Sequence, residues 1–152
     1  MEKELNHYAH SVAQNLYHLE WATKYRDERF RSDFRRQICV AALRFAARKW
    51  SIKIHALRVL PEHVHIFVEL RPAMSPSKAV ALLKGISSRI VRRNVPQLAA
   101  KRELWSPGKF IRSVGNVTSE TIEHYITTSS KNQYGSQETL RGFSVGTGNP
   151  AL

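Results

Sequence analysis

The chain has 152 residues, with 24 lysines and arginines against 12 acidic residues, so its formal net charge is +12 and its pI about 10.4. This length suits one domain with one hydrophobic core. A small domain this basic usually binds a polyanion, most often nucleic acid, although a ribosomal-type protein or a partner of anionic membrane surfaces shows the same balance. No apolar run approaches the roughly 20 residues that cross a bilayer, and the amino-terminal segment is too polar for a signal peptide. We therefore expect a cytoplasmic protein without a membrane partner.

The single cysteine, Cys39, has no intrachain partner, which excludes a disulfide framework and favours a reducing compartment. It falls within an apolar helical pattern, so we interpret it as a small core residue, with a reactive thiol as the alternative. We therefore assign no chemistry to this side chain.

Apolar periodicity predicts a series of strands and helices in chain order. We expect strands at residues 16–23, 52–60, 63–70 and 109–114, and helices at 32–50, at 76–94 and from about 118. Ser32 or Asp33 is a suitable cap for the first helix, and Ser75 followed by Pro76 is a typical start of the second. Pro96 ends the second helix, and a loop is expected from there to the last strand. The apolar stripe of the first helix is expected to comprise Phe34, Ile38, Ala41, Ala42 and Phe45.

This order, β-α-β-β-α-β with an additional carboxy-terminal helix, is typical of an α+β, ferredoxin-like (RRM-like) fold. Such a fold has a four-stranded antiparallel sheet, with the first and third strands central and two helices on one face. We expect residues 1–132 to form this single domain, with Tyr125 on the additional helix. Residues 133–152 are rich in small polar side chains, and we expect a flexible polar tail there.

The third predicted strand alternates the apolar residues Val64, Ile66 and Val68 with His63 and His65. Because side chains alternate between the faces of a strand, the two imidazoles share the face opposite the helices, about 7 Å apart at their Cα atoms. Neutral imidazole nitrogens at that separation can bind one divalent cation of the Mn, Zn or Ni type. An isolated His-x-His is more often a solvent-facing or stacked pair that binds no metal. The strand alone leaves both interpretations open.

Several short motifs lie in a fixed order along the chain. They are Tyr17-His18-Leu19-Glu20-Trp21 with Lys24-Tyr25-Arg26, Leu60 to Val68, Lys84 to Arg89, Pro96-Gln97-Leu98, Leu104-Trp105, Lys109 to Val117 and Thr121 to Ile126. In this order and spacing, over about residues 10–130, the set resembles the HUH single-tyrosine transposases of the insertion-sequence 200/605 type (TnpA-like). No single block is specific, so the ordered set carries the resemblance.

The resemblance implies a DNA transposase that cleaves and rejoins single-stranded DNA at the hairpin-bearing ends of a mobile element. It implies that His63 and His65 bind a divalent ion, Mg²⁺ or Mn²⁺, and that Tyr125 is the nucleophile that forms a 5′-phosphotyrosine. A phenol with a pKa near 10 is a weak nucleophile, and a cation beside the scissile phosphate would offset the developing charge. The resemblance also implies a homodimer with shared active sites, associated with the nucleoid when it binds DNA.

One position departs from the family pattern. The resemblance places a glutamine, as a further metal ligand, one helical turn after the tyrosine, but this chain has Ser129 there. Gln133 lies one turn further, about 12 Å from Tyr125 along a helix axis, which is too far for the same role in a straight helix. The third ligand is therefore left open.

Glu20 is a candidate replacement for that ligand. Alternation along the first strand places Glu20 and His18 on one face, and pairing with the third strand would bring them beside His63 and His65. The alternative is that Glu20 is an ordinary surface carboxylate.

The second helix is expected to present a cationic face that comprises Lys84, Arg89, Arg92 and Arg93. Because the net charge is +12, we interpret this face as a phosphate-binding surface rather than a merely solvated one. Such phosphate contacts would contribute affinity for nucleic acid but little specificity for its base sequence.

A second function fits the same fold. Since Ser129 replaces an expected ligand, the chain could be a catalytically degenerate protein that binds single-stranded or hairpin nucleic acid without cleaving it. RRM-like proteins stack bases on exposed aromatic side chains of the sheet. The candidates for that role are Phe67 and a residue of the strand at 109–114.

Overall fold

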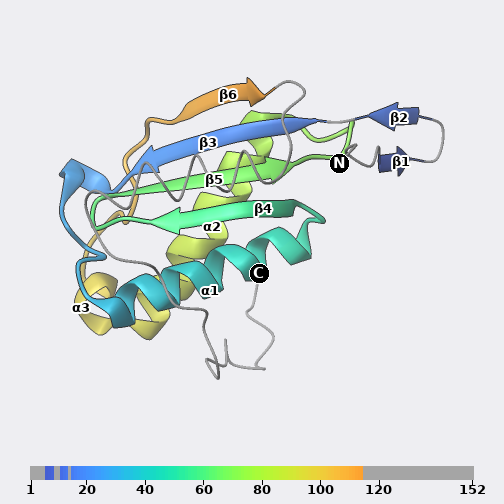
Figure 1. Cartoon of the computed structure of the whole chain (residues 1–152). Helices are drawn as coiled ribbons and strands as arrows, with labels where there is room; N and C mark the ends of the chain where they lie inside the picture. The colour runs from blue at the N-terminus through green and yellow to red at the C-terminus, as the bar shows by residue number, and fades with distance from the viewer. Residues whose placement is uncertain (1–5, 9–10, 14, 115–152) are drawn as a thin grey trace.

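The computed structural model of the protein describes residues 6–8, 11–13 and 15–114, and it has the predicted order of strands and helices (Figure 1). The elements of this order are β3 (Leu16–Ala22), α1 (Asp33–Lys49), β4 (Lys53–Val59), β5 (His63–Glu69), α2 (Pro76–Asn94) and β6 (Phe110–Val114). The predicted caps are confirmed, because the Ser32 and Ser75 hydroxyls each accept a backbone N–H bond from the first turn of their helix. The α+β, ferredoxin-like fold class is likewise confirmed.

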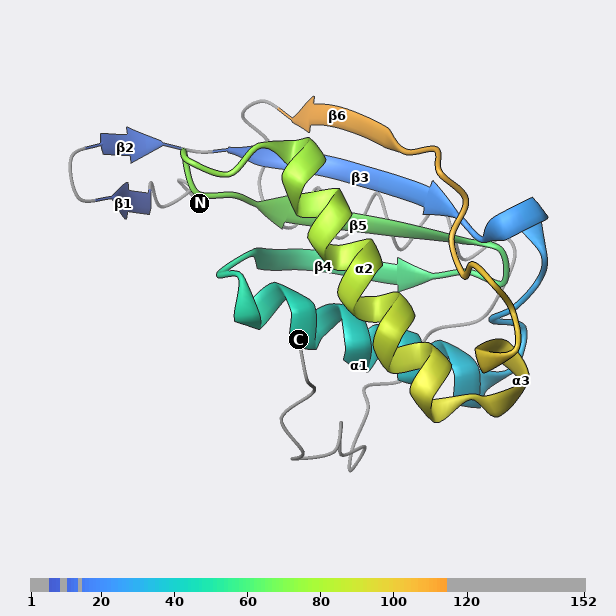
Figure 2. The same ribbon diagram turned by 180° about the vertical axis from the view of Figure 1, so that it is seen from behind.

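The four strands form one antiparallel sheet in the order β4-β5-β3-β6. The two strands that we expected to be central, at 16–23 and 63–70, correspond to β3 and β5 and do lie at the centre. α1 and α2 pack on the same face of this sheet, and Figure 2 shows α2 running across it. No helix within residues 15–114 combines the length and the apolar composition that a membrane crossing needs.

Some elements were not predicted. β1 (Asn6–Tyr8) and β2 (Ser11–Ala13) form a separate hairpin that extends beyond the sheet at the start of β3 (Figures 1 and 2). η1 (Lys24–Arg26) is a single tight turn directly after β3. α3 (Pro96–Ala99) occupies the start of the expected loop, because a proline that cannot continue one helix is well suited to begin another. The predicted tyrosine-bearing helix and the boundary at residue 132 lie outside the described residues.

The hydrophobic core lies between the sheet and the two helices. Leu19 and Trp21 of β3, together with Val64, Ile66 and Val68 of β5, are at most 2% exposed. This burial confirms the predicted alternation on both central strands. The intervening side chains of the two strands consequently face away from the helices.

The apolar stripe that we predicted for α1 is confirmed except at Phe34. Ile38, Ala41 and Ala42 are buried in the core, and Phe45 is partly buried against it. Phe34 is 58% exposed, whereas the side chains that face the core are centred on Cys39, Leu43 and Ala46. Phe34 is rotated about 140° from Cys39 in a helix of 3.6 residues per turn, so the two cannot face the same core. The predicted stripe omitted Leu43, Ala46 and Ala47, which are also buried in this interface. Cys39 is confirmed as a core residue, and burial raises the pKa of its thiol above the ordinary value.

Trp105 attaches the segment before β6 to the core. Its backbone forms an antiparallel bridge with Thr23. Its ring packs edge-on to Trp21 at 5.9 Å between centroids, and lies 5.4 Å from the ring of Phe30. Its buried Nε1–H donates to the Ser87 hydroxyl on α2 at 3.1 Å. One side chain thereby connects the end of β3, the helical layer and the chain that leads into β6.

A buried arginine makes a second attachment nearby. Arg29 is 5% exposed, and its Nη1 donates to the carbonyl oxygens of Leu104, at 3.0 Å, and of Glu103. Its Nη2 pairs with the Asp27 carboxylate at 3.3 Å. The Lys24 N–H also donates to the Leu104 carbonyl, at 3.0 Å. These bonds hold the turn after β3 against the chain that leads to β6.

We predict that Ser87→Ala lowers the free energy of unfolding by about 1–3 kcal/mol, because the buried indole N–H of Trp105 loses its acceptor. Ser88→Ala, at the neighbouring and less buried position, should change it by less than about 0.5 kcal/mol. Urea unfolding followed by tryptophan fluorescence measures both. Equal stability of Ser87→Ala and the wild type would contradict this attachment.

Candidate functional site

The face of the sheet opposite the helices brings the candidate residues together. In the register of β3 and β5, Glu20 lies directly opposite His65, and His18 lies opposite Phe67. Because the intervening residues of both strands face the core, His18 and Glu20 share the face of His63 and His65. The predicted placement of Glu20 and His18 beside the two histidines is therefore confirmed.

His63 and His65 direct their Nε2 atoms toward one another. The two Nε2 atoms lie 2.8 Å apart, and the ring planes are inclined at 75°. Two adjacent ligands of an octahedral ion with bonds of about 2.1 Å are about 3.0 Å apart. The other nitrogen of His63, Nδ1, lies 2.9 Å from Glu62 Oε1. A carboxylate in this position accepts the Nδ1–H and leaves Nε2 as the ligand nitrogen.

The other nitrogen of His65 faces two further side chains. His65 Nδ1 lies 3.0 Å from His18 Nε2 and 3.5 Å from Glu20 Oε2. His18 is held in turn by ring contacts, since it lies parallel to Phe67 at 4.8 Å between centroids and stacks on His65 at 5.2 Å. The imidazole of His65 is thus fixed by neighbours on both of its nitrogens.

Two sets of donors are available to a cation, and they share His65. The first is the Nε2 pair of His63 and His65, 2.8 Å apart. The second comprises His18, Glu20 and His65, whose ligand atoms lie within 4.8 Å of one another. Two ligands on opposite sides of one ion are separated by only about 4.4 Å when the bonds are about 2.2 Å long. The Nε2 pair is therefore the more compact set and has the spacing of two bound ligands.

Burial favours the neutral form of the inner histidines. Desolvation first, and then His63 and Arg58, lower the pKa of His65 from 6.5 to about 4. Desolvation and the neighbouring His65 also lower the pKa of His18, although Glu20 opposes this change. Neutral imidazole is the form that binds a metal ion. At neutral pH the chemistry of the donors thus fits a divalent cation.

The four cationic residues predicted to bind DNA lie on α2, in the helical layer, so the structure does not bring them to the histidine face. Lys84 Nζ donates to two carbonyl oxygens in the loop before β6, at 2.6 and 3.3 Å. Arg92 donates to a carbonyl oxygen of α3 at 3.3 Å. Arg89 and Arg93 are exposed on the helix surface. A DNA strand that contacts both α2 and the histidines would have to pass around an edge of the sheet.

The structure differs from the sequence predictions at Phe67 and at Glu62. Phe67 is unsuited to stack on a base, because it is only 4% exposed and lies beneath His18, whereas Phe110 in β6 is 50% exposed. No role was predicted for Glu62. Its position directly before His63 could have indicated that its carboxylate contacts that imidazole. The remaining predicted site residues, Tyr125, Ser129 and Gln133, lie outside the described residues.

The chain is similar in sequence to known insertion-sequence transposases. A family model described as IS200-like transposase matches residues 11–129. The transposase for insertion sequence element IS200 of Salmonella typhimurium is 31% identical over 121 residues, which cover 78% of each protein. The ISDra2 transposase TnpA of Deinococcus radiodurans is 31% identical over 118 residues, which cover 76% of this chain and 84% of that protein.

Solved structures show the same likeness. A crystal structure of a candidate transposase from Deinococcus radiodurans R1 superposes with a TM-score of 0.67 and 28% identity, covering 87% of this chain and 100% of that one. A REP-associated tyrosine transposase bound to a REP hairpin superposes with a TM-score of 0.58, covering 84% of this chain and 74% of that one. The second protein is 16% identical, so its likeness concerns the fold alone.

We predict that the metal-free protein loses stability as the pH falls from 6.5 toward 4. The folded-state pKa of His65, about 4, lies below the ordinary value of 6.5, so in this window the unfolded chain binds a proton that the folded chain excludes. The contribution is fully present above pH 6.5, and roughly 3 kcal/mol is lost when the pH reaches 4. Thermal unfolding in EDTA across this range should show a shallower pH dependence for His65→Asn. Identical pH profiles for that variant and the wild type would contradict the prediction.

Proposed function

The chain belongs to the family of IS200-like transposases, and we propose that it cleaves and rejoins single-stranded DNA through a covalent bond between Tyr125 and a 5′ phosphate. The observation that carries this proposal is the convergence of His63 Nε2 and His65 Nε2, 2.8 Å apart, on the open face of the sheet. The family match over residues 11–129 includes both histidines and Tyr125. A tyrosine and a pair of metal-binding histidines are the groups that such a reaction needs.

His63 and His65 bind a divalent cation, Mg²⁺ or Mn²⁺, through their Nε2 atoms in this proposal. Glu62 Oε1 lies 2.9 Å from His63 Nδ1, and His65 Nδ1 lies 3.0 Å from His18 Nε2 and 3.5 Å from Glu20 Oε2. Both Nδ1 atoms thus have other partners, which supports Nε2 as the ligand nitrogen of both rings. The bound ion would polarise the scissile phosphate and offset its developing negative charge. Glu20 would then help to orient His65. Because serine is a poor ligand at position 129, oxygen atoms of water and of the substrate phosphate would supply the remaining ligands.

Tyr125 supplies the nucleophile in this proposal. Its phenolic oxygen loses its proton and attacks the phosphorus, and the bond from phosphorus to the 3′ oxygen breaks. That oxygen takes up a proton in exchange and leaves as a hydroxyl group. The 5′-phosphotyrosine retains the free energy of the phosphodiester bond. A second 3′-hydroxyl can therefore attack it, form a new phosphodiester and release the tyrosine without an external energy source.

The substrate in this proposal is single-stranded DNA with hairpin ends, bound by a homodimer with shared active sites. The REP hairpin bound by the structural relative supports this substrate class. A net charge of +12 favours binding to the phosphate backbone, and exposed Arg89 and Arg93 extend the cationic surface. Because its substrate is DNA, we place the protein in the cytoplasm, at the nucleoid when bound.

We predict that Tyr125→Phe abolishes a covalent protein–DNA adduct. Wild-type protein incubated with hairpin-bearing single-stranded DNA and Mn²⁺ should give an adduct that survives denaturing electrophoresis, and EDTA should prevent it. The variant lacks the attacking oxygen. Tyr17→Phe is the control, because Tyr17 packs against the core from β3 and its hydroxyl has no role in the reaction. That control should retain the adduct.

Two outcomes would contradict the proposal in different ways. An adduct of equal yield in Tyr125→Phe would exclude Tyr125 as the nucleophile. Salt-dependent hairpin binding by the wild type, without cleavage in any divalent ion, would support the catalytically degenerate binding protein instead. Cleavage restored by Ser129→Gln would then identify the missing ligand as the cause.

We predict that His63→Ala weakens Mn²⁺ binding by at least about tenfold, because one of the two ligand nitrogens is lost. Glu20→Gln should have a smaller effect, since Glu20 lies 3.5 Å from His65 Nδ1 and is not one of the two ligands in this proposal. Isothermal titration calorimetry measures both affinities. His55→Ala is the control, because that imidazole lies on β4 and contacts Glu69 at 3.0 Å.

The same titration distinguishes the two sets of donors. If Glu20→Gln abolishes Mn²⁺ binding while His63→Ala leaves it intact, the ion is bound by His18, Glu20 and His65 instead. Equal affinity of all variants and the wild type would remove the histidine face as the metal site.

A further inference from the structure

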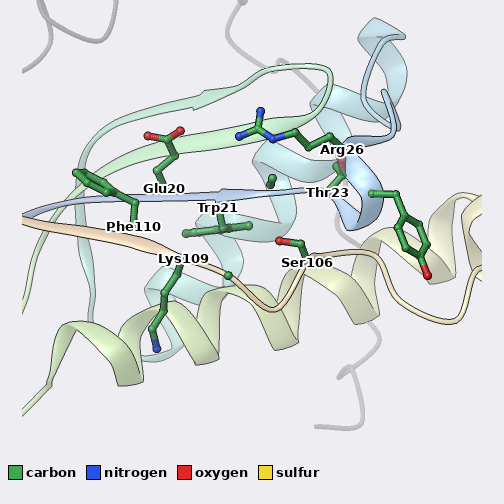
Figure 3. Close-up of a pocket in the computed structure, with 10 residues that line it drawn as sticks. Glu20, Trp21, Thr23, Arg26, Ser106, Lys109 and Phe110 are labelled. Atoms are coloured by element: carbon green, nitrogen blue, oxygen red, sulfur yellow. The ribbon is translucent and has the colours of Figure 1, made fainter.

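A groove borders the histidine cluster on the side of β6 (Figure 3). It has a volume of about 350 Å³, and its lining includes Glu20 of β3, Tyr25 and Arg26 of η1, Ser106, and Phe110 of β6. We call it the Arg26–Phe110 groove. Glu20 also belongs to the cluster of His18 and His65, so the groove adjoins the proposed metal site.

One end of the groove is formed by a strained turn. Tyr25 and Arg26 have φ angles of 58° and 53°, in the left-handed region that is unfavourable for residues with a side chain. The turn is enforced by its surroundings, because the Thr23 hydroxyl donates to the Asp27 carbonyl oxygen at 2.6 Å and Arg29 clamps the adjoining chain. Such strain persists where the surrounding structure imposes it, and it concentrates at functional sites. In this turn the side chains of Tyr25 and Arg26 are exposed.

The side chains of the groove have the chemistry that binds a nucleotide. Phe110 is 50% exposed and Tyr25 is 82% exposed, although each is a large aromatic residue. Within the described part of the chain, Arg26 forms no hydrogen bond or ion pair through its guanidinium group. Figure 3 shows this group extending along β3 toward Glu20, with the Phe110 ring beyond it. Aromatic rings stack on bases, and a free guanidinium pairs with phosphate.

Ring contacts connect the groove to the proposed metal ligands. The Phe110 ring lies edge-on to His18 at 5.9 Å between centroids, and His18 stacks on His65 at 5.2 Å. A base that stacks on Phe110 is therefore close to a phosphate held at His65. Because a base inside a duplex has both faces covered by its neighbours, the base at Phe110 must lie outside a continuous stack, as an unpaired base does.

We propose that the Arg26–Phe110 groove binds one unpaired nucleotide of the DNA strand, next to the phosphate that faces His63 and His65. Phe110 stacks on its base, and Arg26 pairs with a flanking phosphate. The inference rests on the proposed function, because it takes the phosphate at the two histidines to be the scissile one. It adds a protein pocket for a single base beside the site of strand cleavage.

The test measures binding without metal or cleavage. Full-length protein in EDTA is titrated with a labelled DNA hairpin that has unpaired extensions on both sides, and fluorescence anisotropy gives Kd. A series of the same oligonucleotides carries one abasic residue, moved through the extensions position by position. One abasic position should weaken wild-type binding by about tenfold, the effect of losing one stacked base.

Phe110→Ala should weaken binding of the intact oligonucleotide by a similar factor and remove the sensitivity to that abasic position. Both changes delete the same contact, so their effects should not add. Phe110→Tyr keeps a ring and should retain the sensitivity. Arg26→Ala should weaken binding of every oligonucleotide and reduce the slope of log K against log salt by about one.

Phe34→Ala is the matched control, since Phe34 is 58% exposed against 50% for Phe110 but lies on α1, in the helical layer. It should bind as the wild type does and keep the abasic sensitivity. Melting temperatures show whether each variant is folded. If Phe110→Ala does not fold, Phe110→Leu provides the same readout with the apolar bulk of β6 preserved.

The proposal is overturned if folded Phe110→Ala binds as tightly as Phe34→Ala and keeps its sensitivity to the abasic position. It is also overturned if no abasic position affects the wild type. Failure of the proposed function gives a different result. In that case wild-type protein forms no adduct through Tyr125, while an abasic effect that depends on Phe110 still identifies the groove as a nucleotide-binding site.

Discussion

The antiparallel pairing of β3 with β5 is the constraint on which the rest of the site depends. Its register sets Glu20 opposite His65 and His18 opposite Phe67. A slip of one residue would exchange the two faces of a strand and send the imidazoles into the core. Val64 and its apolar neighbours are completely buried, so the free energy of burying them holds the register. The hydrophobic core therefore determines the geometry of the polar face.

The two faces of the sheet have different roles. The helices cover one face and form a core, which leaves the other face available for chemistry. Partial burial on that open face has two linked consequences for His65. Desolvation keeps the imidazole neutral and able to bind a metal ion, and the same desolvation makes the folded chain sensitive to acid. The desolvation that keeps His65 able to bind a cation thus also lowers the stability of the folded chain at low pH.

The Arg26–Phe110 groove depends on contacts that lie elsewhere in the fold. Trp105 and Arg29 join the turn after β3 to the chain that enters β6, and this attachment brings the two ends of the groove together. The strained backbone of Tyr25 is stable only because those contacts enforce it. The buried side chains of Trp105 and Arg29 therefore help to determine the shape of the surface on which we place the DNA strand.

Sequence patterns alone determined the order of the elements, the central strands, and the face shared by His63, His65 and Glu20. The elements and the shared face follow from local periodicity, because a strand alternates its side chains whatever lies beside it. The central strands follow from the fold that is typical of this order of elements. The ordered motifs also indicated the family, which the comparisons confirmed. Of the apolar stripe predicted for α1 only Phe34 was wrong, because it lies about 140° around the helix from the buried Cys39.

Only the tertiary structure decided which atoms meet at the site. His18 and His65 are 47 residues apart in the chain, yet their nitrogens lie 3.0 Å apart. The same holds for the groove, which is lined both by the left-handed turn at Tyr25 and by Phe110 of β6. Neither arrangement leaves a periodic trace in the sequence, because each results from packing between segments that are distant along the chain. Local patterns determine which face a side chain occupies, and only the packed core determines which side chains touch.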